Sequence, residues 1–92
     1  MAISIQFTRP LSQLIGEECI TQSIDKHTTL QQAIDTLIKN SAEPVKQFLQ
    51  ETNQRLRPSI VLMVNQRQVS QPTQHPLNDG DTVTIISPMA GG

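Results

Sequence analysis

The sequence predicts an α+β fold, with a mixed sheet of four to five strands and one main helix packed across it. Residues 2–8 alternate apolar and polar side chains, which is the pattern of a half-buried strand. Residues 30–38 place apolar side chains at the spacing of one helix face. Two further strand-like runs, residues 60–64 and 82–86, follow the helix. Strands on both sides of a single long helix in the chain are typical of a compact α+β layout.

Length and composition limit the chain to one small domain. It has 92 residues, which is enough for one modest hydrophobic core. Hydrophobic residues make up 36% of the chain and only two residues are aromatic, so the core must consist mainly of Ile, Leu and Val. The formal net charge is -1, and there is neither a basic stripe nor an aromatic platform. We therefore expect no nucleic-acid partner.

Cysteine usage and the apolar runs indicate a cytoplasmic protein. Cys19 is the only cysteine, so an intrachain disulfide is impossible. The first residues lack the charged region and long apolar run of a secretory signal. The longest apolar run, residues 60–64, is too short to cross a bilayer, so we expect no membrane partner.

The first half of the chain reads as a hairpin with a long loop. The first strand, residues 2–8, ends before Pro10, which lacks a backbone donor for the sheet. Residues 11–16 are interpreted as a connection, with Gly16 at a turn. Residues 19–24 form a weaker strand that we expect to pair with the first.

The main helix carries the clearest local signals. Thr29 and Gln32 fit a capping box at its start, and Asn40 can end it. Pro44 then opens a shorter helical piece, because proline is favoured in a first turn. The apolar face of the main helix consists of Leu30, Ala33, Ile34, Leu37 and Ile38.

The second half predicts three strands. Residues 60–64 are apolar throughout, which indicates a strand covered on both faces. Residues 65–68 can turn the chain, and Val69 is predicted to start a short return strand. Residues 79–81, Asp-Gly-Asp, are a strong turn signal before the last strand, residues 82–86.

The last five residues are predicted to form a flexible C-terminal tail, residues 88–92, beyond a folded domain of residues 1–87. Pro88 ends strand pairing, and Gly91 and Gly92 have no side chains, so this tail can enter a narrow channel. The alternative is a frayed end without a function, because chain ends are often disordered. We interpret the carboxylate of Gly92 as the reactive group, presented by Pro88, Met89, Ala90 and Gly91.

The order of these elements resembles the ubiquitin-like β-grasp fold. Residues 77–92, LNDGDTVTIISPMAGG, resemble the end of the MoaD/ThiS-type sulfur-carrier proteins. That family includes the small subunit of molybdopterin synthase, the sulfur carrier of the thiamine pathway and a carrier used in one route to cysteine. The pair Val64-Asn65 before a short return strand also matches. The similarity is strong over residues 60–92, whereas the first half matches in layout more than in sequence.

Several residues depart from the family pattern. Gln66 stands where a turn glycine is common, which predicts a longer hairpin loop or another turn type. Ile86 and Ser87 stand where molybdopterin members often have paired aromatics, and Met89 replaces a more usual valine. The chain is also longer than a typical thiamine carrier. These departures favour a molybdopterin-type or cysteine-type carrier over the thiamine type.

The resemblance implies that the chain catalyses nothing and that the chemistry takes place on Gly92. A ubiquitin-activating-type adenylating enzyme would use ATP and magnesium to form an acyl-adenylate there. Sulfide or a persulfide would displace AMP and leave a thiocarboxylate. The sulfur would pass to an accepting enzyme such as the molybdopterin synthase large subunit, a cysteine-synthase-like enzyme or a thiazole synthase. The chain has no G-x-x-x-x-G-K-[ST] phosphate loop, so we expect ATP to be held by the partner and no cofactor by this chain.

A partner needs a docking surface, and alternation along the strands predicts one. Val61, Met63 and Ile86 are expected to point away from the core and to form an apolar patch leading toward the tail. The alternative is that these side chains pack under the loops at residues 51–58 or 70–76. Two rival functions share the same tail: a protein modifier joined through Gly92 to lysines, and an interaction module with an inert tail.

Other residues with reactive side chains have structural interpretations. Cys19 is interpreted as a small buried apolar residue rather than a persulfide relay. His27 and His75 are far apart in the sequence and have no ligand partners, so we expect no metal site. Asp79 and Asp81 flank a glycine and are interpreted as turn formers.

Overall fold

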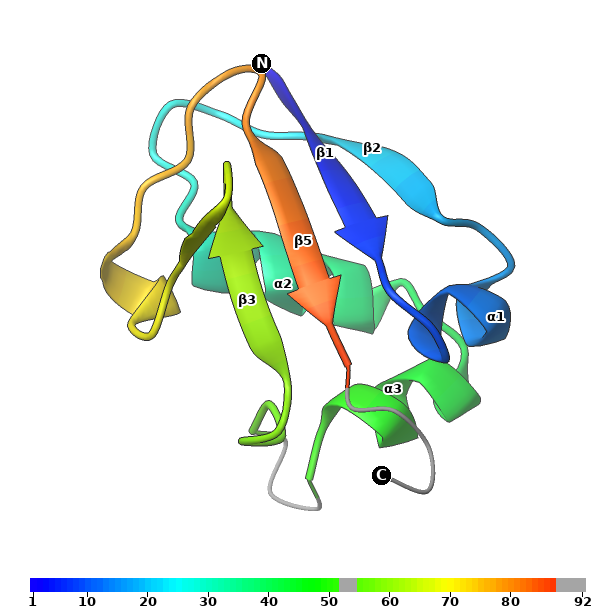
Figure 1. Cartoon of the computed structure of the whole chain (residues 1–92). Coiled ribbons are helices and arrows are strands. Elements are labelled where there is room, and N and C mark those ends of the chain that lie inside the picture. Colours follow the sequence, from blue (N-terminus) through cyan, green and yellow to red (C-terminus); the bar gives the residue numbers. More distant parts are fainter. Residues whose placement is uncertain (52–54, 88–92) are drawn as a thin grey trace.

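The computed structural model of the chain describes residues 1–51 and 55–87 (Figure 1). Five strands and three α-helices follow one another in these ranges, with a short 3-10 turn before the last strand. The elements are β1 (Ala2–Phe7), α1 (Leu11–Ile15), β2 (Cys19–Ser23), α2 (Leu30–Lys39), α3 (Glu43–Leu49), β3 (Val61–Val64), β4 (Arg67–Gln68), η1 (Pro72–Gln74) and β5 (Thr82–Ile86).

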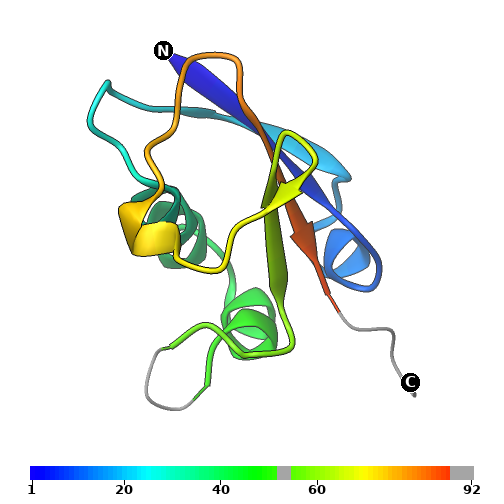
Figure 2. The same cartoon turned by 60° about the vertical axis from the view of Figure 1, so that its left-hand side comes forward.

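The strands form one mixed sheet in the order β2-β1-β5-β3-β4. β1 and β5 pair in parallel at its centre, and every other neighbouring pair of strands is antiparallel. Helices α2 and α3 lie on one side of the sheet, as the two views show (Figures 1 and 2). The predicted mixed sheet crossed by one main helix is therefore confirmed.

The core lies between that side of the sheet and the helices. In β1, Ile3, Ile5 and Phe7 are buried, as the alternation of this strand predicts. Val83 and Ile85 of β5 continue the same layer, with Ile5 directly opposite Val83. Burying each such side chain stabilises the fold by roughly 1.5–3 kcal/mol relative to leaving it exposed.

Helix α2 begins and ends where its sequence signals predict. The Gln32 amide donates to the Thr29 hydroxyl at 3.3 Å, and the Thr29 amide donates to the Gln32 side chain at 3.0 Å, which completes the capping box. Asn40 is the C-cap. The predicted apolar face is fully confirmed, because Leu30, Ala33, Ile34, Leu37 and Ile38 are all buried.

The turn before α2 is held by Asp25. Its carboxylate accepts a hydrogen bond from the His27 amide at 2.8 Å and one from the Thr28 hydroxyl at 3.1 Å. These bonds lower the pKa of Asp25 below its usual value, the His27 amide having the larger effect. The charged form is therefore the one that organises this turn.

The interpretation of residues 11–16 as a plain connection is wrong, because residues Leu11–Ile15 form the short helix α1. Leu11 is fully buried and fixes this turn against the core. One and a half helical turns are too short to show an apolar period, so tertiary burial decides the conformation. Gly16 ends the helix with a φ of 88°, which confirms the predicted turn.

The expectation that β3 is covered on both faces is also wrong. Leu62 and Val64 are buried together with Ile60, whereas Val61 and Met63 are only half-buried. The helices cover one side of the sheet only, so a strand that is apolar throughout still alternates in burial. This alternation is the one on which the predicted outward patch depends.

The hairpin between β3 and β4 has a two-residue loop, although Gln66 replaces a turn glycine. Val64 pairs with Arg67, so only Asn65 and Gln66 lie between the strands. Their φ angles of 50° and 74° are both positive, as in the favoured type I′ hairpin. The prediction of a longer loop or another turn type is therefore wrong. The return strand is Arg67–Gln68, which ends just before the predicted Val69.

We predict that Gln66→Gly stabilises the protein by about 0.5 kcal/mol. A residue with a Cβ in the left-handed region is disfavoured by roughly 1 kcal/mol, which exceeds the extra chain entropy that glycine loses on folding. Urea unfolding monitored by circular dichroism measures the change. Gln68→Gly is the matched control, because Gln68 is exposed but extended, and this change should destabilise. Equal losses in both variants would show that the turn holds no strain at Gln66.

Candidate functional site at the root of the tail

The chain is anchored up to the residue before the predicted tail. Ser87 follows β5 and is only 5% exposed. Its amide donates to the Thr8 hydroxyl at 3.0 Å, and its own hydroxyl donates to the Arg9 carbonyl at 3.1 Å. The Thr8 amide in turn donates to the Ile85 carbonyl at 3.2 Å. The root of the tail is therefore fixed to the segment that follows β1.

The opposite end of β5 is held by a cluster of side-chain hydrogen bonds. Asp81 accepts from the Asn65 side chain and from the Asn78 amide, each at 2.8 Å. The Asn65 side-chain oxygen accepts from the Thr82 amide at 2.9 Å. Asn65 thus ties the β3–β4 hairpin to the start of β5, which gives the pair Val64-Asn65 a structural reason.

The Asp-Gly-Asp turn itself is bound to the start of β1. Asp79 accepts from the Ala2 amide at 2.9 Å, and the Gly80 amide donates to the Ala2 carbonyl at 2.8 Å. Gly80 has a φ of 84°, in the region that favours glycine. The interpretation of both aspartates as turn formers is confirmed.

The tail residues Pro88, Met89, Ala90, Gly91 and Gly92 lie outside the described residues. Their role as presenting arm and reaction site stays a prediction. The anchored Ser87 does fix the point at which the tail begins. Five residues beyond it can span at most about 17 Å when fully extended.

The structure brings the three predicted patch residues together on the sheet face that α2 and α3 leave uncovered. Val61 of β3 is directly opposite Ile86 of β5, and Met63 is opposite Thr84. All three patch side chains are half-buried. Val61 and Ile86 lie at the end of the sheet where Ser87 begins, so the patch adjoins the tail root. Its role as a docking surface stays a prediction.

The rest of this outer face carries no charge on β1, β2 or β5. Alternation places small polar or apolar residues there, and Gln6 of β1 lies between Cys19 of β2 and Thr84 of β5. The outward residues of these strands are Ala2, Ser4, Gln6, Cys19, Thr21, Ser23, Thr82, Thr84 and Ile86. A partner can cover an uncharged face of this kind at a low desolvation cost, because no charge must be removed from water.

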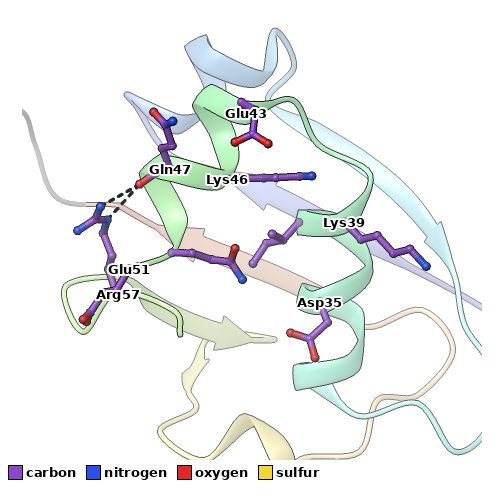
Figure 3. A pocket seen from close by; sticks show the side chains of 9 residues that line it. Asp35, Lys39, Glu43, Lys46, Gln47, Glu51 and Arg57 are labelled. Atoms are coloured by element: carbon purple, nitrogen blue, oxygen red, sulfur yellow. Dashed lines mark hydrogen bonds between the residues drawn. The ribbon is translucent and has the colours of Figure 1, made fainter. Parts of the chain in front are cut away.

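A hollow lies on the helix side of the molecule, between α2, α3 and residue 57 (Figure 3). It has a volume of about 930 Å³ and is wide open to solvent. Side chains of both charge signs line it, and the Arg57 guanidinium donates twice to the Gln47 carbonyl, at 3.2 and 3.0 Å. Leu56 forms a β-bridge, and Arg57 directly after it holds this part of the chain against α3. The mixture of charges selects no ligand class.

The remaining reactive residues do not converge on a site. The interpretation of Cys19 as buried is wrong, because it is exposed on the outer face of the edge strand β2. The segments of the two histidines are brought together, since the Leu30 amide donates to the His75 carbonyl at 2.8 Å. Within residues 1–51 and 55–87, however, no three His, Cys, Asp or Glu side chains form a group that could hold a metal ion.

The anchors at the two ends of β5 are the site features that sequence reasoning missed. Each joins residues far apart in the chain, Thr8 with Ser87 and Asn65 with Asp81. For the Thr8–Ser87 anchor, polar residues at strand ends near Pro10 and Pro88 were the available signal. For the second anchor, the signals were the pair Val64-Asn65 and the Asp-Gly-Asp turn. For the part of the chain that the structure describes, no helix combines the length and the apolarity needed to cross a bilayer.

Comparison with known proteins shows what this arrangement is similar to. A family model described as the ThiS family matches residues 5–92. No curated protein matches the chain in sequence. Among solved structures, SAMP1 of Haloferax volcanii is similar with a TM-score of 0.86 and 18% identity, covering 100% of both chains. Urm1 of Trypanosoma brucei has a TM-score of 0.77 and 29% identity, covering 99% of this chain and 95% of that one.

A third similar structure comes from a complex of subunits 1 and 2 of the molybdopterin-converting factor of Helicobacter pylori. Its TM-score is 0.65 at 21% identity, with 100% of both chains covered. Together these likenesses confirm the ubiquitin-like β-grasp fold that the order of elements resembles.

We predict that Thr8→Val lowers the free energy of unfolding by about 1–2 kcal/mol, because the buried Ser87 amide loses its acceptor. Urea unfolding measures the change, and amide hydrogen exchange at Ser87 should accelerate. Thr82→Val is the matched control: no hydrogen bond of the Thr82 side chain is found within the described residues. If the two variants lose the same stability, the Thr8–Ser87 anchor contributes nothing specific.

Proposed function

Because the chain belongs to the ThiS family, we propose that it is a sulfur carrier that holds sulfur as a thiocarboxylate on Gly92. The observation that carries the proposal is the tail root. Ser87 is buried and hydrogen-bonded on both its amide and its hydroxyl, directly before the run Pro-Met-Ala-Gly-Gly. A fixed root with an unobstructed glycine end suits delivery of one carboxyl carbon into another protein's active site.

The proposed chemistry takes place on the Gly92 carboxylate, which is a poor electrophile because its charge repels nucleophiles. Attack of this carboxylate on the α-phosphorus of ATP forms an acyl-adenylate and releases pyrophosphate. Hydrosulfide then adds to the acyl carbon, AMP leaves with the bonding electron pair, and a proton is released as the thiocarboxylate forms. The chain supplies the carboxyl group, and the partner supplies the binding of ATP and magnesium.

The proposed partners follow from this division of labour. A ubiquitin-activating-type adenylating enzyme activates Gly92, and a sulfur-accepting enzyme takes the sulfur from it. The departures from the family pattern, among them a chain longer than a typical thiamine carrier, favour the molybdopterin synthase large subunit or a cysteine-synthase-like enzyme over a thiazole synthase. The similar Helicobacter pylori chain was solved in a complex of two molybdopterin-converting factor subunits. That complex supports a two-chain arrangement for this protein.

We place docking on the patch of Val61, Met63 and Ile86. These side chains adjoin the tail root and are only half-buried, so a partner that covers them also surrounds the base of the tail. The uncharged outer face next to the patch adds area without a desolvated charge. A half-buried apolar cluster at this position serves both activation and sulfur transfer, because both reactions need the same tail.

A second candidate function is protein modification, in which a lysine amine displaces AMP from the activated Gly92. Its support is the likeness to SAMP1, since a similar structure is named a small archaeal modifier protein. Sulfide and lysine compete for the same acyl-adenylate. Free thiocarboxylate in cells supports the carrier, whereas isopeptide-linked conjugates that disappear when Gly92 is removed support the modifier.

We predict that the chain gains the mass difference between sulfur and oxygen when incubated with an adenylating enzyme, ATP, magnesium and sulfide. Intact-protein mass spectrometry detects the exchange, and fragmentation assigns it to Gly92. The matched control, Gly92→Pro, should stay unmodified, because proline fixes the backbone angle that the narrow channel must accept. An unchanged mass, with an enzyme that modifies its own carrier under the same conditions, contradicts the proposal.

We predict that Met63→Asp reduces the rate of activation at least about tenfold, because a charge must be buried when a partner covers the patch. The free energy of unfolding should change little, since Met63 is half-buried. Ser4→Asp is the matched control, as it adds the same charge on the same sheet face but opposite Thr82, at the end of β5 away from Ser87. Unfolding of the Met63 variant would show that Met63 belongs to the core instead.

A further inference from the structure

The edge strand β2 has backbone groups that the sheet does not use. The Glu18 carbonyl and the Ile24 amide bond to β1, so the even-numbered residues of this stretch face β1. The alternation of an antiparallel pair then directs the amides and carbonyls of Cys19, Thr21 and Ser23 away from the sheet. These groups have no backbone partner within the described residues.

This edge lacks the features that usually protect an edge strand. Cys19–Ser23 contains no charged residue and no proline, and its register with β1 is continuous, without a bulge. Natural proteins commonly protect such an edge with lysine, proline or a bulge, because unpaired backbone groups attract another strand. The opposite edge, β4, is only two residues long and therefore offers little to pair with.

An apolar pocket opens directly beside this edge. It has a volume of about 290 Å³, lies between β2, α1 and the junction of α2 with α3, and has no charged side chain in its lining. Ile20 of β2 forms one wall, and Leu14 of α1, 46% exposed, forms the rim. Further along β2, the Gln22 side chain donates to the Ala33 carbonyl at 3.2 Å and bridges β2 to α2. The pocket therefore opens beside Ile20, and Gln22 is not part of its lining.

The two features fit one kind of ligand. A peptide that adds to β2 turns every second side chain toward the helix side of the sheet, where the pocket lies, and the others toward the outer face. That outer face is uncharged along β2 and β1. Backbone hydrogen bonds supply affinity in strand addition, and pockets for alternate side chains supply specificity.

Charge at the start of β2 adds a further requirement. Glu17 and Glu18 directly precede the strand and are exposed. Arg9, Glu17 and Glu18 line one surface hollow next to the start of β2, and their three side chains together carry one net negative charge. A bound peptide with a basic residue next to its apolar part would place that residue close to Glu17 and Glu18, where opposite charges attract.

We propose that β2 and the pocket beside Ile20 form a strand-addition site for an extended segment of another protein, with an apolar residue in the pocket and basic residues beside Glu17 and Glu18. The start of β2 and the end of β5 lie at the same end of the sheet, since Gln6 is opposite Cys19 and Phe7 is opposite Ile85. A partner held here is therefore brought close to the tail root. The site does not depend on the thiocarboxylate chemistry.

A second copy of the chain fits this edge less well than a partner. Two strands of five residues bury only a few hundred Å², below the roughly 1,000 Å² expected of a specific interface. An antiparallel pairing centred on Thr21 would also place Glu17 opposite Asp25 of the second copy, which are like charges. The edge and the pocket therefore favour a basic, apolar segment from elsewhere.

The test uses the full chain labelled with ¹⁵N and two synthetic heptapeptides. One is acetyl-Thr-Val-Thr-Leu-Thr-Lys-Lys-amide. In antiparallel pairing its two lysines lie opposite Glu18 and Glu17, and its leucine then lies opposite Ile20, on the helix side where the pocket opens. The other has the reversed sequence for parallel pairing. At saturation with one of them, hydrogen exchange of the Thr21 amide should slow at least about tenfold, because this amide gains an acceptor. Chemical-shift changes should cluster on β2, Leu14 and residues 40–42.

Three variants separate the backbone, the pocket and the charge. Thr21→Pro removes the outward donor and should weaken peptide binding at least about tenfold, while the fold is kept because that amide is not bonded to β1. Leu14→Glu puts a charge on the pocket rim and should weaken binding similarly. Changing both Glu17→Lys and Glu18→Lys should reduce affinity about threefold to tenfold, and should favour peptides with glutamate in place of lysine.

Three results would overturn the proposal. The first is unchanged exchange of the Thr21 amide with both peptides at millimolar concentration. The second is a set of chemical-shift changes centred on Val61, Met63 and Ile86 instead of β2. The third is protection of the Thr21 amide that increases with protein concentration without peptide, together with a dimer in sedimentation, which would assign the edge to self-association.

Discussion

The structure depends on the fixation of β5 at both of its ends. At its start, Asp81 holds the Asn65 side chain, which in turn accepts from the Thr82 amide. At its end, the buried Ser87 is bonded to Thr8. The strand lies between β1 and β3, so these bonds join the first and last parts of the chain. A slip of β5 by one residue would exchange its core face for its outer face and break both anchors. The position at which the tail leaves the fold is thereby set to a single residue.

The second constraint is that α2 and α3 cover only one side of the sheet (Figure 2). The other side must remain compatible with water, and it does so with short uncharged side chains instead of charged ones. The exception is the apolar corner of Val61, Met63 and Ile86. Such a surface has a low desolvation cost when a partner covers it. Its apolar corner lies at the end of β5, just before the chain leaves the sheet. The fold and the proposed docking therefore follow from one asymmetry.

Local patterns in the sequence were sufficient for the elements with a clear period and a cap. The α2 capping box and the alternation of β1 are local signals, and the structure confirms both. The helix α1 could not be predicted, because its five residues show no period and burial of Leu11 decides its form. Gln66 is similar: backbone twist of the paired strands imposes a positive φ that its side chain disfavours. Contacts between Thr8 and Ser87, or Asn65 and Asp81, join residues whose proximity only the fold creates. The role proposed for Gly92 rests on the sequence, whereas the anchoring of Ser87 before the tail is visible only in the tertiary structure.

The sheet order separates two surfaces that could otherwise compete for partners. β2 is separated from β5 by β1, and from β3 by β1 and β5. With neighbouring strands about 4.8 Å apart, the edge lies roughly 10 Å from β5 and 14 Å from β3. A segment added to β2 lies in the plane of the sheet and fills a pocket on the helix side, whereas the patch of Val61, Met63 and Ile86 faces the opposite side. Both surfaces can therefore be occupied at once, and a partner on the edge leaves the tail root accessible. Under the proposed function, in which the chain visits an activating enzyme and then an acceptor, this separation allows one contact to persist while the other changes.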